Sequence, residues 1–265
     1  MVNSPIVTVA VPSLNQGRFL EEALESIFIQ DLAVEVYVVD GGSKDESLKI
    51  IRRWERRLAG WRSYPDSGQA AAINEAIANG GAPFVCWLNS DDRWLPGALG
   101  KLVATLQSQP DAPAVYGNVM NQGARGLSPL RVEPFSEERL ARRCIISQPG
   151  TLIRRASWNE IGGLREDLHM ALDYDLWWRL YKQFGPLVYD ARMVAVNRDH
   201  PNTKTNRFRR QHYREAIAVV REHFGRVPLR WWLAQPYSVW ARGLWAMWHS
   251  RGLHGARAGR QPREE

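Results

Sequence analysis

The chain has 265 residues, of which 45% are hydrophobic and 24% charged, a composition typical of a globular protein with room for one large domain and an appendage. Its formal net charge of +7 favours an acidic partner, such as nucleotide phosphates, anionic lipid or nucleic acid. Two distant cysteines exclude a disulfide framework, and no apolar run of about 18 residues predicts a membrane-spanning helix. No signal-peptide pattern precedes the first predicted strand, so we expect a cytoplasmic protein.

The first half of the chain alternates between predicted strands and predicted helices. Residues 6–11 and 34–39 are apolar and β-branched, which favours strands. A helix with one apolar face follows each of them, and Ser43 with Glu46 predicts a capping box at the start of the second helix. This alternation indicates a parallel sheet with right-handed crossovers.

A third predicted strand, residues 84–88, runs directly into Asn89, Ser90, Asp91 and Asp92. Adjacent ionised carboxylates repel each other, so the aspartate pair is costly unless a cation or hydrogen-bond donors lie beside it. Ligands bind at the carboxyl ends of strands in open α/β sheets, which favours a binding site at this position. A solvated turn is the alternative, because Asn, Ser and Asp are common turn residues.

Two further aspartates should come to the same edge of the sheet. Asp40 ends the second predicted strand and Asp66 precedes the next helix, and parallel strands would gather both near Asp91 and Asp92. Carboxylates in such a crevice could hold the base or ribose of a nucleotide, or a Mg²⁺ or Mn²⁺ ion. Asp40 and Asp66 could each instead cap the following helix. The glycine motifs of P-loop and dinucleotide-binding proteins are absent after the first strand.

The second half of the chain is less regular. Residues 114–118 and 186–196 are predicted strands, and residues 122–134 are predicted to form a surface excursion or a hairpin. A strongly apolar helix begins near Asp173.

The last part of the chain, residues 206–265, is rich in tryptophan and arginine and is predicted to be helical, with a disordered end. It could cover the preceding domain or lie in a membrane interface, where tryptophan and arginine suit the headgroup layer. The flanking arginines favour an anionic membrane surface. Nucleic acid is not an expected partner, because no recognition motif accompanies the charge.

Five segments resemble motifs of the family 2 glycosyltransferases, and they occur in the family's order: residues 7–15, 38–45, 66–74, 88–92 and 173–180. Together the resemblance spans residues 6–200. It implies an α/β fold of the GT-A type, a Rossmann-like and mainly parallel sheet flanked by helices, here followed by the C-terminal helical extension. It also implies transfer of a sugar from a nucleotide donor with inversion at the anomeric carbon.

The resemblance assigns roles residue by residue. It implies a donor and nucleotide site at Pro12, Ser13, Asn15, Asp40, Gly42, Asp66, Gln69, Asn74, Asn89 and Ser90. It implies a Mn²⁺ or Mg²⁺ site at Asp91, Asp92 and His200, with Asp91 as the principal ligand. The general base would be Asp173, and acceptor-side or secondary positions would be Gln148, Asp175, Trp177 and Arg198.

An inverting transferase needs a carboxylate that takes the proton of the acceptor hydroxyl, and Asp173 matches that position. Burial beside Tyr174, Trp177 and Trp178 would raise the pKa of Asp173 toward a useful value. Asp173 could also cap the helix that follows it, and the two roles are compatible.

The chain departs from the family's pattern at two positions. Asn89 replaces the first aspartate of the metal-binding motif, which leaves one fewer negative charge for the cation. Leu172 replaces the acid before the general base. These departures keep open a nucleotide- or glycan-binding module without catalysis. A sugar-1-phosphate nucleotidyltransferase is the alternative enzyme, although residues 12–16 lack the Gly-rich basic loop that it would need.

The sequence therefore predicts a metal-dependent, inverting glycosyltransferase that uses a UDP-, dTDP- or GDP-sugar. Its acceptor would be a glycan or a lipid-linked saccharide, in cell-surface polysaccharide biosynthesis. Residues 1–205 are expected to form the catalytic domain, with the nucleotide-sugar half in residues 1–120 and the acceptor half in residues 121–205. The extension would place the protein at the inner face of the cell membrane if it binds anionic lipid.

Overall fold

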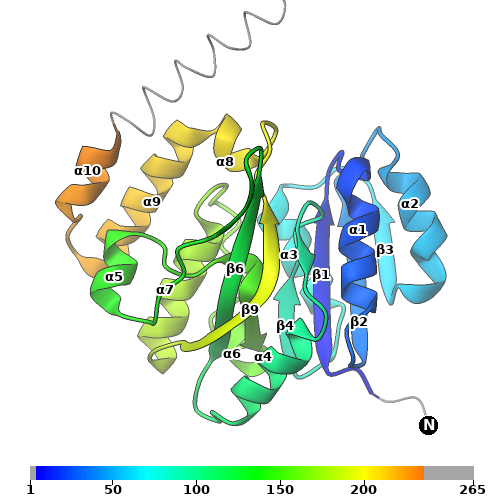
Figure 1. Cartoon of the computed structure of the whole chain (residues 1–265), viewed down its shortest axis with the longest axis horizontal. Coiled ribbons are helices and arrows are strands. Elements are labelled where there is room, and N and C mark those ends of the chain that lie inside the picture. Colours follow the sequence, from blue (N-terminus) through cyan, green and yellow to red (C-terminus); the bar gives the residue numbers. More distant parts are fainter. Residues whose placement is uncertain (1–3, 236–265) are drawn as a thin grey trace, which may run out of the picture.

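A mixed β-sheet runs through the centre of the computed structural model, which describes residues 4–235 (Figure 1). Its strands are β1 (Val7–Ser13), β2 (Val34–Asp40), β3 (Gly60–Ser63), β4 (Phe84–Trp87), β5 (Arg93–Trp94), β6 (Ala114–Gly123), β7 (Gly126–Pro129), β8 (Thr151–Arg154) and β9 (Val188–Arg198). They are ordered β3-β2-β1-β4-β8-β6-β9-β5, and β7 pairs with β6.

Helices cover both faces of the sheet. They are α1 (Gly17–Phe28), α2 (Ser47–Trp54), α3 (Gln69–Ala78), α4 (Ala98–Gln107), α5 (Glu137–Arg142), α6 (Arg155–Glu160), α7 (Leu172–Phe184), α8 (Lys204–Arg207), α9 (Arg209–Phe224) and α10 (Leu229–Gln235). Alternate residues of β1 enter two separate cores, one shared with α1, α2 and α4 and the other with α3, α7 and α9. This two-sided burial explains why β1 and β4 are apolar at consecutive positions.

The parallel half of the sheet confirms the predicted strand–helix alternation. β3, β2, β1 and β4 are parallel neighbours, so their carboxyl ends lie at one edge. Asp40 ends β2, and the polar stretch that begins at Asn89 follows β4 at the same edge. The topology therefore brings together the polar residues that the sequence analysis singled out.

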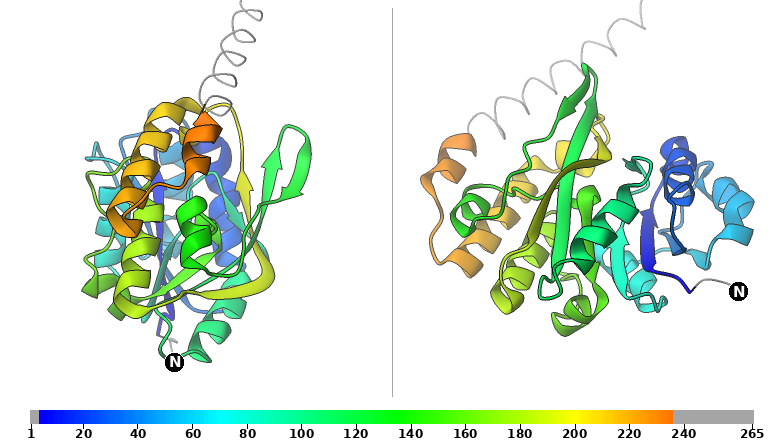
Figure 2. Two further views of the ribbon diagram at one scale, coloured as in Figure 1. Left: turned by 90° about the vertical axis from the view of Figure 1, so that its left-hand side faces the viewer. Right: turned by 60° about the horizontal axis from the view of Figure 1, so that its bottom comes forward.

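The other half of the sheet contains antiparallel pairs. β8 runs antiparallel to β4 and β6, and residues 122–134 include the β6–β7 hairpin, which projects beyond the sheet (Figure 2). The short strand β5 comes directly after Asp92 and pairs antiparallel with β9, where Arg93 lies opposite Val196. This pairing places the end of β9 beside the aspartate pair.

The predicted capping box at Ser43 and Glu46 is wrong. Helix α2 begins at Ser47, whose N–H donates to Oδ1 of Asp45 at 3.0 Å. Ser43 instead donates its hydroxyl to the carboxylate of Asp40 and accepts the N–H of Asn15 at 2.7 Å. The hydroxyl of Ser43 thus stabilises the turn after β2 and does not cap α2, because the buried carboxylate of Asp40 requires hydrogen-bond donors.

The described part of the C-terminal extension packs on the domain. Helix α9 lies against α7 (Figure 1), and Ala216, Ile217 and Val220 enter the core that α7 shares. On α10, Trp231 is buried and its Nε1–H donates to the carbonyl oxygen of Ala141 at 2.8 Å. Among residues 4–235, no helix is both long and apolar enough to cross a bilayer. The predicted disordered end and the later tryptophans lie outside the described residues, and the domain boundary stays a prediction.

Candidate functional site

A cavity of about 820 Å³ opens where the parallel strands end. It contains most of the residues that the sequence analysis predicted as a site: Pro12, Ser13, Asp66, Gln69, Asn89, Ser90, Asp91, Asp92, Gln148, Asp173 and Arg198. The far wall comes from the loop before α7 and from α8 and α9, with His169, Met170, Lys204, Arg207 and Gln211. Residues from both halves of the chain thus share one cavity.

Asp91 and His200 form a pair at the edge of this cavity. Nε2 of His200 lies 3.2 Å from Oδ2 of Asp91, and their side chains are 15% and 18% exposed, respectively. His200 follows β9 and its ring packs on Phe19, with 4.9 Å between the ring centroids. A carboxylate oxygen and an imidazole nitrogen at this separation suit a divalent ion such as Mn²⁺, which accepts both ligand types. Other coordination positions would remain open to phosphate oxygens and water.

Asp92, the next residue after Asp91, hydrogen-bonds to neighbouring parts of the protein. It is almost fully buried, and its two oxygens accept the N–H of Arg198 at 2.9 Å and Nδ2–H of Asn89 at 3.2 Å. Burial, together with the charge of Asp91, raises the pKa of Asp92 above its usual range. Both oxygens are engaged within the protein, so Asp92 fixes the end of β9 and is poorly placed to be a principal ligand.

A chain of hydrogen bonds explains the amide at position 89. Nζ of Lys204 donates to Oε1 of Gln69 at 3.2 Å, and Nε2 of Gln69 donates to Oδ1 of Asn89 at 2.8 Å. Nδ2 of Asn89 donates to Oε1 of Gln148 at 3.1 Å, and Nε2 of Gln148 donates to the carbonyl oxygen of Trp87 at 2.7 Å. Asn89 acts as donor and acceptor at once, which a carboxylate cannot do. An aspartate there would also face Oε1 of Gln148.

Asp173 is the second residue of α7 and lines the cavity. Its Oδ1 accepts the N–H of Tyr174 at 2.8 Å, and Ala171 rather than Asp173 occupies the cap position of the helix. Burial raises the pKa of Asp173 to about 6, and the N–H of Tyr174 and the charge of Lys204 only partly oppose this effect. A carboxylate with such a pKa suits proton abstraction near neutral pH.

The loop before Asp173 is held by Glu215, which the sequence analysis missed. One carboxylate oxygen of Glu215 accepts three backbone N–H groups, from His169 at 3.0 Å, Met170 at 2.6 Å and Ala171 at 3.1 Å. Gln211 donates to the other oxygen at 2.8 Å. Glu215 is on α9, more than 40 residues later in the chain, and no local pattern could have linked it to this loop.

Asp40 is not among the residues that line the cavity, and its predicted role at the nucleoside stays a prediction. The side chain is fully buried, and its Oδ2 accepts the N–H groups of Gly42 at 3.1 Å and Ser43 at 2.8 Å and the hydroxyl of Ser63 at 2.7 Å. Asn15 and Gly42 likewise support this turn, since Oδ1 of Asn15 accepts the N–H of Lys44 at 2.9 Å. These residues shape the loop beside the cavity.

Asp66 does line the cavity, as the sequence predicted. Nη1 of Arg62 donates to its Oδ2 at 3.2 Å, and the N–H of Gly68 donates to its Oδ1 at 3.0 Å. Both partners hold the carboxylate at the rim next to Pro12 and Ser13. Its role as a donor-pocket residue stays a prediction.

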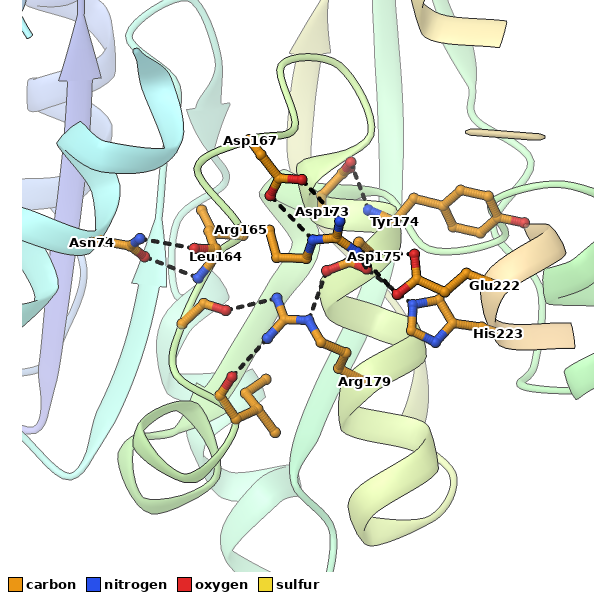
Figure 3. A network of polar contacts seen from close by, with 12 residues as sticks. Asn74, Leu164, Arg165, Asp167, Asp173, Tyr174, Asp175, Arg179, Glu222 and His223 are labelled. Atoms are coloured by element: carbon orange, nitrogen blue, oxygen red, sulfur yellow. Dashed lines mark hydrogen bonds and ion pairs between the residues drawn. The ribbon is translucent and has the colours of Figure 1, made fainter. Parts of the chain in front are cut away.

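Asp175 and Trp177, predicted as acceptor-side or secondary positions, and Asn74, predicted at the donor site, do not line the cavity, so these roles stay predictions. Asp175 is fully buried, and the ring of Trp177 stacks in the core with Trp87 at a centroid distance of 6.1 Å. Asn74 bonds to both the N–H and the carbonyl oxygen of Leu164, each at 2.9 Å (Figure 3). The alternation of helical faces explains this outcome, since Asp173 and Asp175 point in different directions on α7.

Asp175 is the centre of a buried ionic network (Figure 3). Nε of Arg179 donates to its Oδ2 at 2.7 Å, and Nε2 of His223 lies 2.9 Å from its Oδ1. Burial raises the pKa of Asp175, but His223 and Arg179 outweigh this effect and hold the pKa below its ordinary value. Arg179 also donates to the carbonyl oxygens of Ile161 and Gly163. The network therefore ties α7 to α9 and to the loop after α6.

Replacing Arg179 by methionine is expected to destabilise the fold by about 3–5 kcal/mol, because it removes a partner of a buried carboxylate. The free energy of unfolding would be measured by urea denaturation. Lys49→Met is the matched control, since Lys49 pairs with Glu46 on the surface and such pairs contribute only about 0–1 kcal/mol. Equal stability of the two variants would show that the network does not hold α7 in place.

Comparison with known proteins identifies the family. The model described as Glycosyl transferase family 2 matches residues 8–160 of this chain. An uncharacterized glycosyltransferase of Rickettsia prowazekii is 24% identical over 216 residues, which cover 77% of this chain and 67% of that protein. A glycosyltransferase of Rickettsia felis is 25% identical over 209 residues, and these cover 74% of this chain but only 34% of the relative.

Solved structures share the fold. TarS from S. aureus, in a complex with UDP-GlcNAc, has a TM-score of 0.67 at 18% identity, and the match covers 84% of this chain and 67% of the TarS chain. The mannosyltransferase PcManGT from Pyrobaculum calidifontis, in a complex with GDP-Man and Mn²⁺, has a TM-score of 0.63 at 22% identity, covering 98% of this chain and 77% of the other. These matches confirm the predicted GT-A fold. Since the family model covers more than half of the sequence, the chain belongs to glycosyltransferase family 2.

Proposed function

We propose that this protein transfers a sugar from a nucleoside diphosphate to a hydroxyl group, with inversion at the anomeric carbon. One observation carries the proposal: the Asp91–His200 pair and the acidic group of Asp173, whose pKa is raised to about 6, belong to the same cavity region at the carboxyl ends of the strands. The first feature suits a metal–diphosphate group, and the second suits proton abstraction from an acceptor.

The donor would lie along the edge formed by β1 and β4. Its nucleoside would contact the rim of Pro12, Ser13 and Asp66, and its sugar would approach Gln69 and Asn89. TarS is in a complex with UDP-GlcNAc and PcManGT is in a complex with GDP-Man and Mn²⁺, which supports a UDP-, dTDP- or GDP-sugar and a divalent ion here. Asp91 and His200 would hold Mn²⁺ or Mg²⁺, which when bound neutralises the charge of the leaving diphosphate.

Asp173 would act on the acceptor. Its carboxylate takes the hydroxyl proton while the hydroxyl oxygen bonds to the anomeric carbon and the bond from that carbon to the diphosphate breaks. The loop held by Glu215 fixes the position of this carboxylate. Arg198 lines the same cavity, but its guanidinium is paired with Glu22, which leaves it a secondary role.

We further propose that the donor carries a hexose and that the acceptor is a glycan or a lipid-linked saccharide. The reaction would take place in the cytoplasm and contribute to the synthesis of a cell-surface polysaccharide. The hydrogen bonds of Asn89 favour catalysis over a binding module without activity, because they account for the asparagine without loss of the Asp91 site. Leu172 is buried in the core, so its replacement of an acid leaves no unpaired charge near Asp173.

The pH dependence follows from the raised pKa of Asp173. The base acts only when it is ionised, so kcat/KM should fall about tenfold per pH unit below about pH 6 and level off above it. Initial rates at saturating metal between pH 5 and pH 8 would measure this profile. A rate that is flat across pH 5 to 7 would remove Asp173 from the role of base.

Incubation with a panel of nucleotide sugars and Mn²⁺ tests the proposal as a whole. We expect release of the nucleoside diphosphate from at least one donor, and faster release when a saccharide acceptor is added. Tight nucleotide binding without release from any donor would favour the binding module. Pyrophosphate-dependent formation of nucleoside triphosphate would favour the nucleotidyltransferase.

A further inference from the structure

We propose that the outer side of α10, together with a small cavity at its start, binds anionic phospholipid membranes. The lipid-docking surface consists of Arg142 on α5, Arg226 in the loop after α9, and Leu229, Trp232 and Leu233 on α10. It lies apart from the sugar-transfer cavity, with which it shares no lining residue. Figure 2 shows α10 on the outer side of α9.

The apolar part of this surface is a helical stripe that faces outward. Leu229, Trp232 and Leu233 are spaced i, i+3 and i+4, so they share one side of α10. They are 68%, 47% and 70% exposed. The neighbouring Trp231 is 8% exposed and donates to Ala141, which anchors the opposite side of the helix to the protein. A large apolar stripe on the solvent side of an anchored helix marks an interaction surface.

The charged part of the surface is a cavity of about 310 Å³ at the start of α10. Its lining includes Arg142, Arg226 and Leu229. Glu138 is the one acidic residue in the lining, and it accepts a hydrogen bond from Ser136 at 2.7 Å. Among residues 4–235, neither Arg142 nor Arg226 forms an ion pair with a carboxylate within 4.0 Å. Two arginines in the lining of a small cavity supply donors that suit the oxygens of a phosphate.

The two parts fit one ligand because Leu229 belongs to both. A phospholipid headgroup in the cavity would lie next to the apolar stripe, which could then enter the acyl boundary. Helices that lie in a membrane interface are usually arranged in this way: their arginines lie at the level of the phosphates, and their leucines and tryptophans lie deeper, toward the acyl chains.

The positive charge of the sequence that contains α10 favours lipids with a negatively charged headgroup. Residues 223–263 contain seven arginines and no aspartate or glutamate. Such a segment is attracted to the negative surface of an anionic leaflet and gains little from a zwitterionic one. Nucleic acid would satisfy the charge but would leave the stripe of Leu229, Trp232 and Leu233 in water.

Vesicle co-sedimentation of the full chain tests this proposal. We expect binding to vesicles of equal parts phosphatidylcholine and phosphatidylglycerol, and little binding to phosphatidylcholine alone. The double variants Leu229→Asn/Leu233→Asn and Arg142→Gln/Arg226→Gln should each lower the bound fraction about tenfold. The stripe and the arginines are exposed, so thermal unfolding should confirm that both variants are folded.

Matched controls change the same residue types elsewhere. Leu127→Asn alters an exposed leucine on the β6–β7 hairpin, and Arg52→Gln/Arg56→Gln removes two exposed arginines near the end of α2. Both should bind vesicles as the wild type does. Sugar transfer to a soluble acceptor should be unchanged in every variant, so the outcome is independent of the proposed reaction. The proposal is overturned if the wild type ignores anionic vesicles, if the docking variants bind normally, or if the wild type prefers single-stranded RNA to vesicles.

Discussion

Asp173→Asn is expected to lower the rate of sugar transfer by about 10²–10⁴-fold, the usual contribution of a general base. The amide keeps the shape of the side chain, and its oxygen can still accept the N–H of Tyr174. It cannot take a proton from the acceptor at neutral pH. Donor affinity should remain within about twofold, since the metal and nucleoside positions lie on other elements.

Steady-state transfer rates and direct titration of the nucleoside diphosphate would separate these two effects. Asp111→Asn is the matched control, because Asp111 is an exposed aspartate that does not line the cavity. Its rate should equal that of the wild type. Asp173→Asn with full activity, or with activity lost only through donor binding, would contradict the assignment of the base.

Asp91→Asn is expected to weaken Mn²⁺-dependent binding of the nucleoside diphosphate by more than about tenfold and to reduce turnover at least as much. The substitution removes the charged ligand and leaves His200 without the carboxylate 3.2 Å away. Titration of the nucleotide with and without Mn²⁺ would measure the change as a loss of metal dependence.

Asp92→Asn provides the comparison within the same pair. Because both oxygens of Asp92 are engaged by Arg198 and Asn89, we expect its loss to change the stability of the β9 end more than the affinity for metal. A larger loss of metal affinity in Asp92→Asn than in Asp91→Asn would exchange the roles assigned to the two carboxylates.

The sequence was informative about the parallel half of the fold because its strands are apolar at consecutive positions and alternate with amphipathic helices. The polar residues after β4 could be placed at the carboxyl edge for the same reason, and the resemblance to family 2 added Asp173 and His200 from distant segments. Asp173 lines one cavity together with the polar residues after β4, and His200 contacts Asp91 at the edge of that cavity. The parallel half of the fold and the family motifs could both be recognised without knowing which side chains touch.

Orientation of individual side chains could not be predicted in this way. Asp175 and Trp177 share a motif with Asp173, yet Asp175 lies only two residues further along α7, about half a turn, and its carboxylate belongs to the buried ionic network instead of the cavity. Asp40 matches a ligand position in the motif, but its oxygens accept hydrogen bonds from two backbone N–H groups of its own turn and from the hydroxyls of Ser43 and Ser63. The contribution of Glu215 depends on α9 packing beside α7, a tertiary contact without a local signal.

A crystal structure of the protein with Mn²⁺ and a nucleoside diphosphate, chosen from UDP, dTDP and GDP, would locate the metal ion and the nucleotide relative to Asp91, His200 and Asp173. We expect an anomalous manganese peak in contact with Asp91 and His200, and the diphosphate in the cavity beside Asp173. A peak at the cluster of Asp175, Glu222 and His223, or a nucleotide bound outside the cavity, would contradict this expectation.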